Sequence, residues 1–254
     1  VTHIGKHAFA GCTSLTGVVL PAGHRTIGAC AFRGDAAITT IDLPAGITTA
    51  SSVASAPFAG SGILTANFDS AITSVPANIL GGCENLTTIN IDGTFNKLTE
   101  VEDGAFCGCK QLAAVNLPTT VETIGERAFE GCETITGARL PDKLTYLGKD
   151  AFKNCKALSQ VNIPKDMKIV ADEYGFGPFA GCSALTEASK IDFAPSISTI
   201  PANLFAGCNG LTSYVVPVQI TSIGDSAFYY CENLASVTFD RDTAVSLGKG
   251  AFYR

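Results

Sequence analysis

Ten cysteines give the chain reactive side chains that could pair in disulfides, ligate a metal or act as nucleophiles. Eight share one setting, because each follows a phenylalanine, or in one case a leucine, by three residues: Cys12, Cys83, Cys109, Cys132, Cys155, Cys182, Cys208 and Cys231. Thiols that recur once per repeat form a column. Metal ligands must converge on one point, and the thiols of a column do not. Since Cys is among the most buried residue types, we expect buried free thiols.

Cys30 and Cys107 lie outside this series, at positions where other repeats carry charged or polar residues. We predict that these two thiols are solvated, and that they react or pair between chains more readily than the others. They are three repeats apart. At no less than about 4.8 Å per repeat, their separation exceeds the Cα distance of roughly 7 Å that a disulfide tolerates, so no bridge between them is expected.

Arg33-Gly34-Asp35 spells the tripeptide that integrin receptors bind. Gly34, however, stands where other repeats have glycine, and Asp35 stands where the column has cysteine. The repeat therefore accounts for the motif without a receptor. We predict that Asp35 is at least partly buried, where a carboxylate must find N–H donors or shift its pKa.

Other short motifs predict no separate chemistry. His3 and His7 are four residues apart but lack a third metal ligand, and Gly175-Phe176-Gly177 does not follow a strand as a phosphate-binding loop would. Asn85-Leu86-Thr87 is a glycosylation sequon whose leucine belongs to the repeat. The sequence has no G-x-S-x-G, H-E-x-x-H or P-loop motif. We therefore expect no enzymatic activity, no cofactor and no metal.

An internal repeat positions all of these residues. Its aromatic position recurs every 22 to 27 residues, at Phe9, Phe32, Phe58, Leu80, Phe106, Phe129, Phe152, Phe179, Phe205, Phe228 and Phe252. Leu112 to Pro118 reads L-x-x-V-x-L-P, and its alternation predicts one short strand per repeat. Val121, Ile124 and Phe129 then lie three to five residues apart, which predicts a turn and about one helical turn. A single coil buries too few apolar side chains to be stable alone, so the coils must stack with their strands parallel.

From Leu112 to Cys132 the unit resembles, position by position, that of the BspA-like (Treponema-type) leucine-rich repeats, L-x-x-V-x-L-P-x-x-V-x-x-I-G-x-x-A-F-x-x-C. The resemblance covers nearly the whole chain. It implies an α/β solenoid: a right-handed superhelix with one short parallel strand per repeat and short helical turns or loops on the other side. We expect residues 1–254 to form a single domain of ten to eleven repeats, excerpted from a longer chain.

Composition narrows the classes of partner. The chain is 46% apolar, only 16% charged and has a net charge of -6, without a run of Lys or Arg. This composition is typical of a packed array, and it argues against nucleic acid and anionic membrane surfaces as partners. No uninterrupted apolar stretch is long enough to span a bilayer, so no membrane insertion is expected in this segment.

Two surfaces are candidate binding sites. Strand residues between the core positions must face outward, and this row includes Ser189 together with the candidate ligand-binding residues Asp42, Asn90, Asn116, Arg139, Asn162 and Thr238. A second patch, Met167, Tyr174 and Phe176, falls in the 27-residue step between Phe152 and Phe179, where exposed aromatics would suit an interface. The same patch could instead pack down over its coil.

The function classes follow from the resemblance. Proteins of this kind are typically displayed on the surface of host-associated bacteria and some protists, and several are adhesins. This implies an extracellular or cell-surface location, with the periplasm as the alternative. It also implies a binding module for host matrix proteins, cell-surface proteins or a glycan. The alternative is a structural or self-assembling scaffold that spaces other domains.

Overall fold

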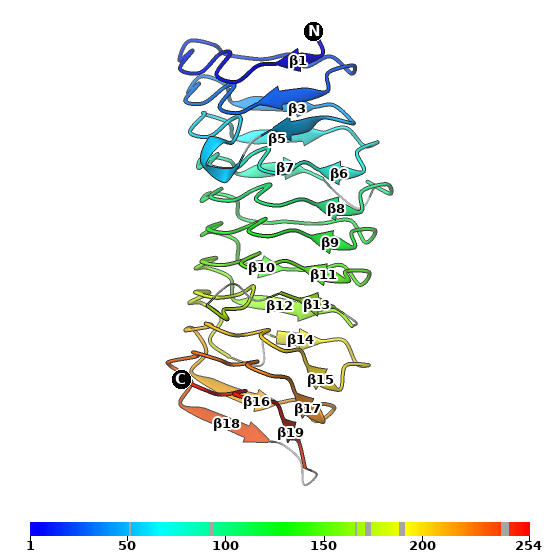
Figure 1. Ribbon diagram of the computed structural model, residues 1–254, viewed down its shortest axis with the longest axis vertical. Helices are drawn as coiled ribbons and strands as arrows, with labels where there is room; N and C mark the ends of the chain where they lie inside the picture. The colour runs from blue at the N-terminus through cyan, green and yellow to red at the C-terminus, as the bar shows by residue number, and fades with distance from the viewer. Residues whose placement is uncertain (51, 92–93, 166, 171–173, 188–190, 240–243) are drawn as a thin grey trace.

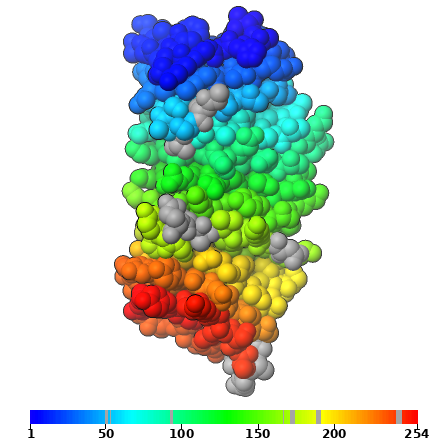
Figure 2. Space-filling view, in the orientation of Figure 1, coloured from blue at the N-terminus to red at the C-terminus, as the bar shows by residue number. Residues whose placement is uncertain are grey.

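A computed structural model describes residues 1–50, 52–91, 94–165, 167–170, 174–187, 191–239 and 244–254. The chain winds into about ten stacked turns, with the two termini toward opposite ends of the stack (Figure 1). Figure 2 shows that each part of the chain occupies its own layer, so that residues contact mainly their own turn and the turns above and below. This is the arrangement that the repeat predicts.

Most of the L-x-x-V-x-L segments form a first row of parallel strands, to which residues 112–117 add only an isolated bridge from Val115 to Ala138. They pair within three short sheets: β3 (Thr40–Leu43), β5 (Thr65–Phe68) and β7 (Thr88–Asn90); β10 (Gly137–Ala138), β12 (Gln160–Ile163) and β14 (Ile191–Phe193); β16 (Ser213–Val216) and β18 (Ser236–Phe239). Buried and exposed residues alternate in β3 and β16, as expected of strands with one buried face; the exposed residues are polar in β3, and in β16 they are Ser213 and Val215.

A second row of parallel strands runs beside the first (Figure 1), and the sequence analysis did not predict it. Its members are β1 (His3–Ile4), β2 (Thr26–Gly28) and β4 (Thr48–Ala50); β6 (Ser74–Val75), β8 (Glu100–Val101), β9 (Thr123–Ile124), β11 (Tyr146–Leu147) and β13 (Lys168–Ile169); β15 (Thr199–Ile200), β17 (Ser222–Ile223) and β19 (Ser246–Leu247). The expectation of one strand per repeat was therefore wrong.

Glycines let the turns of the second row approach closely. A Cβ atom on Gly148 would lie 2.6 Å from the backbone nitrogen of Glu126 in the preceding turn, and one on Gly125 would lie 2.6 Å from that of Asp103. No side chain fits at such a distance, which explains the glycine after Ile124 and the one after Leu147.

The predicted helical turn does not form, so the α/β description was also wrong. The helical element of the described residues is a single 3₁₀ segment, η1 (Val53–Ser55). In the turn around Phe129, the backbone N–H groups alternate: Arg127, Phe129 and Gly131 donate to the next coil, at 2.8–3.0 Å, while Glu130 and Cys132 donate to carbonyls three residues back. The positive φ angles of Arg127 (53°) and Gly131 (70°) interrupt any helix and aim alternate N–H groups along the stack.

The core is a column of phenylalanine rings. Most rings at the aromatic position stack on their neighbours with centroids 5.1–6.3 Å apart, from Phe9 to Phe58 and from Phe106 to Phe252, with the aliphatic Leu80 between the two runs. Leucine, isoleucine and valine from the two strand rows pack around these rings. The predicted buried aromatic column is confirmed from Phe32 to Phe228, while Phe9 is 41% exposed and Phe252 is half-buried.

Candidate functional site

The thiol column is a structural feature. Each thiol from Cys109 to Cys231 donates a hydrogen bond to the carbonyl oxygen of the aromatic position one coil back, over 3.1–3.3 Å, and Cys83 does the same with Phe58. Burial raises the pKa of the Cys83, Cys182 and Cys231 thiols to about 12. Such thiols stay protonated at neutral pH and are poor nucleophiles or metal ligands. The prediction of buried free thiols is confirmed for all of the column except Cys12, which is exposed.

Cys30 and Cys107 are not solvated, so that prediction was wrong. They are 3% and 8% exposed, and all ten cysteines are free. Glu130 of the next coil covers Cys107, with its Oε2 atom 3.8 Å from the Sγ atom. Burial, and then the charge of Glu130, raises the pKa of Cys107 to about 12. Neither thiol can therefore serve as an accessible nucleophile.

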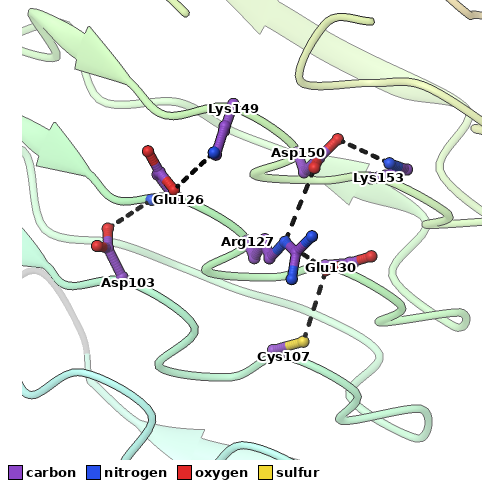
Figure 3. Close-up of polar contacts among 8 residues, drawn as sticks. All are labelled: Asp103, Cys107, Glu126, Arg127, Glu130, Lys149, Asp150 and Lys153. Atoms are coloured by element: carbon purple, nitrogen blue, oxygen red, sulfur yellow. Dashed lines mark hydrogen bonds and ion pairs between the residues drawn. The ribbon is translucent and has the colours of Figure 1, made fainter. Parts of the chain in front are cut away.

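Charged side chains form a network over this part of the turns (Figure 3). Asp150 is almost fully buried, and its carboxylate lies 3.0 Å from Lys153 Nζ and 3.8 Å from Arg127 Nε. Arg127 also lies 3.4 Å from Glu130. A parallel pair joins Lys149 to Glu126 at 3.4 Å. Arg127–Asp150 and Lys149–Glu126 join adjacent coils, whereas Asp150–Lys153 and Arg127–Glu130 lie within one turn. These pairs compensate the buried charge of Asp150, so the network has a structural role.

Asp35 is fully buried, as predicted, which rules out the integrin reading of Arg33-Gly34-Asp35. One of its oxygens accepts a hydrogen bond from the backbone N–H of Cys12 at 2.8 Å. Burial raises the pKa of this carboxyl group, and the N–H groups of Cys12 and Gly11 partly oppose the increase. Arg33 is exposed, but a receptor metal cannot reach the carboxylate beside it.

The histidines and the glycosylation sequon form no separate site among the described residues. His3 and His7 are exposed, His24 is buried with its Nε2 atom 3.0 Å from the Thr26 carbonyl, and the described residues contain no cluster of three or more metal-ligating side chains. Leu86 of the sequon is a core residue, as expected.

The second candidate patch is largely packed against the stack. Met167 is only 7% exposed and belongs to the core, so it cannot contribute to a binding surface. The Phe176 ring packs against Tyr229 and Tyr230, with centroids 6.4 and 6.0 Å apart. Tyr174 alone is strongly exposed, at 70%.

The first strand row presents the outward polar residues predicted from the sequence, with two additions. Asn67 and Asp192 also belong to this row, since Asp42 pairs in register with Asn67, Asn67 with Asn90, and Asn162 with Asp192. Asp42 accepts a hydrogen bond from Asn67 at 2.6 Å, and Asn90 donates one to Asn67. Asp192 therefore takes the place in the row that the sequence analysis gave to Ser189, which lies outside the described residues.

An open groove of about 980 Å³ crosses β10, β12 and β14 on this face. Its lining brings together three of the six predicted residues, Asn116, Arg139 and Asn162, with Asp142, Gln160 and Asp192. Asp42, Asn90 and Thr238 lie elsewhere, on β3, β7 and β18. The Asn162 amide accepts a hydrogen bond from Leu140 N at 2.7 Å and donates one to Leu140 O at 2.8 Å, which fixes the middle of the groove. The side chains can bind a polar ligand, but they do not form an acid–base or nucleophile pair.

These features define a parallel β-solenoid with a groove across one strand row, and comparisons place it among known proteins. The profile of the BspA type leucine rich repeat region matches residues 2–101, 93–188 and 175–254, in six copies. The chain therefore belongs to the BspA-type leucine-rich repeat family, as the repeat unit had indicated. This family is one of repeat interaction modules, and the match indicates no catalytic family.

Solved structures agree with the fold. A leucine-rich repeat protein from Bacteroides ovatus is 23% identical, with a TM-score of 0.73 over 99% of this chain and 67% of that one. One from Eubacterium ventriosum is 19% identical, with a TM-score of 0.51 over 99% of this chain and 79% of that one. A comparison with curated protein sequences finds no match. Within the described residues, no helix has the length and apolar character needed to cross a membrane.

Proposed function

We propose that the chain is a binding module, displayed on a cell surface or secreted, that holds a partner protein in the groove of the first strand row. The observation that supports this most is the groove itself, because the repeat places polar side chains from successive turns along one rigid surface. The family supports an extracellular setting. An adhesin that contacts host matrix or cell-surface proteins is the role that suits both features.

The rest of the outward row supports the choice of this segment. Near β3, β5 and β7 the polar side chains bond to one another, through Asp42, Asn67 and Asn90. In the groove, by contrast, Arg139 and Asp192 are exposed and make no ion pair with any described residue. Charged groups that remain unpaired in the free protein can be used for a partner.

Replacing Asn116, Arg139 and Asn162 together by alanine is expected to abolish binding, which means a rise in Kd of at least tenfold. The reason is that the groove loses its positive charge and two of its amide groups. Surface plasmon resonance against immobilised matrix proteins and host glycans measures the effect. Thermal unfolding should change little, apart from a small loss from the Asn162 bonds to Leu140.

The matched control replaces Asp42, Asn90 and Thr238 by alanine, since these residues share the outward row but lie outside the groove. It should bind as the unaltered chain does. Unchanged binding by the groove variant, or equal losses in both variants, would reject this surface. If no ligand in the set binds the unaltered chain, the alternative role of a rigid spacer between other domains gains support.

A further inference from the structure

The groove has an uneven distribution of charge. Its lining includes one cation, Arg139, and two carboxylates, Asp142 and Asp192, and all three side chains are exposed. None of them makes an ion pair with another residue that the structure describes. A ligand that offered only negative or only positive groups would therefore meet repulsion at one end of the groove.

The strand register fixes the spacing of these charges. Val115 is bridged to Ala138 and Ala138 pairs with Val161, so Arg139 lies beside Asn162 in the outward row. Asn162 pairs with Asp192 one strand further on. The backbones that carry Arg139 and Asp192 are thus two strands apart, which is about 9.6 Å between their Cα atoms at the usual strand spacing.

Asn162 stands between these two residues, and the floor beside the outward row is open. Gly137, in the strand that leads to Arg139, has only the Gln160 carbonyl oxygen within 4 Å of where a Cβ atom would stand, at 3.9 Å. Ala114 adds another short side chain to the lining. The amide of Asn162 is bonded to Leu140 and does not compete for Arg139 or Asp192. A ligand backbone can therefore lie across the strands with its side chains directed at the two charges.

We propose that this groove binds an extended protein segment in the polyproline II conformation that carries an acidic and a basic side chain three residues apart. The inference rests on the proposed function and specifies its ligand. Polyproline II has three residues per turn and a rise of about 3.1 Å, so residues i and i+3 share a face and lie about 9.3 Å apart. The acidic side chain pairs with Arg139 and the basic one with Asp192.

Other regular conformations fit less well. In a β-strand, residues i and i+3 point to opposite faces. In an α-helix, side chains three or four apart are only about 5–6 Å from each other. Among side chains three or four residues apart, only those of a polyproline II segment therefore share a face at about two strand spacings.

Isothermal titration calorimetry tests the inference with three synthetic peptides of one length: Pro-Pro-Glu-Pro-Pro-Lys-Pro-Pro and its Glu/Glu and Lys/Lys counterparts. The 254-residue chain should bind the Glu/Lys peptide at least about fivefold more tightly than either counterpart, since each opposed pair contributes modestly at an exposed site. Arg139→Glu should shift the preference to Lys/Lys, and Asp192→Lys should shift it to Glu/Glu.

Asp42→Lys is the matched control, because it makes the same charge change in the same outward row but outside the groove. It should leave the order of the three affinities unchanged. Equal affinities for all three peptides, or no binding at millimolar concentration, would overturn the inference. An alanine-based helical peptide with Glu and Lys seven residues apart spans a similar distance, and equal binding by it would also contradict an extended ligand.

The outcome can be separated from that of the proposed function. If matrix proteins or glycans bind and the Asn116/Arg139/Asn162 variant loses them while the Glu/Lys peptide does not bind, the groove remains the binding surface and this ligand class is wrong. If the Glu/Lys peptide binds equally well to the unaltered chain and to that variant, its site is elsewhere and the inference fails.

Discussion

Replacing Phe129 by alanine is expected to lower the free energy of unfolding by about 3–5 kcal/mol. Its ring is fully buried and stacks between those of Phe106 and Phe152, with centroids 5.3 and 5.1 Å away. The two neighbouring rings belong to separate coils held apart by their backbones, so they cannot close the cavity. Because the stability of a solenoid depends on contacts between adjacent repeats, both interfaces of this coil are weakened.

Urea unfolding followed by circular dichroism measures the loss. Phe239→Ala is the matched control, because it deletes the same atoms from a ring that is 41% exposed at the end of β18. That variant should lose about 1 kcal/mol or less. Similar losses for the two variants would mean that the column of rings does not dominate the core.

Replacing Gly148 by alanine is expected to cost about 3 kcal/mol, at the upper end of the range for overpacking. The added Cβ atom would meet Glu126 N and Gly125 C at 2.6 Å, and both are backbone atoms of the neighbouring coil. Flexible side chains could move aside, but here the coils themselves must separate. That movement would also strain the β9–β11 pairing beside the glycine.

Gly17→Ala provides the control, because nothing lies within 4 Å of a Cβ atom at that position. Its unfolding free energy should change by about 0.5 kcal/mol or less. A Gly148→Ala variant as stable as Gly17→Ala would show that the turns are not packed backbone to backbone along the second strand row.

Most of the core could be predicted from the sequence, because period and residue type together determine it. Phe129 and Cys132 recur at fixed positions, and only a stack can bury all of their counterparts. Asp35 follows the same logic, since it occupies the cysteine position of a coil that has neighbours on both sides and is buried there despite its charge. The first strand row was predictable from the alternation of Leu112, Val115 and Leu117 with polar residues.

The second strand row and the missing helix could not be predicted in this way. Thr123 and Ile124 form a strand of two residues, too short for an alternating pattern to be visible. The spacing of Ile124, Ala128 and Phe129 is compatible with a helix, and nothing in the sequence shows that Arg127 adopts a positive φ. Tertiary hydrogen bonds between coils favour this conformation over a helical turn.

The errors at individual residues arise from neighbouring coils and from insertions. Cys107 occupies a position that is polar in other repeats, but the next coil supplies Glu130 to cover it. Asp192 was missed because its repeat is lengthened before β14, which moves the strand three residues along the chain. The groove depends on these local departures from the repeat, so only part of its lining was predictable.

Successive turns stack in register, with phenylalanines and thiols in the interior. Titration of the native chain with a thiol-reactive aromatic disulfide measures this most directly. The stack predicts that one thiol, Cys12, reacts before unfolding and that ten react after unfolding in denaturant. Rapid reaction of several thiols in the native chain, or fewer than ten after unfolding, would contradict it.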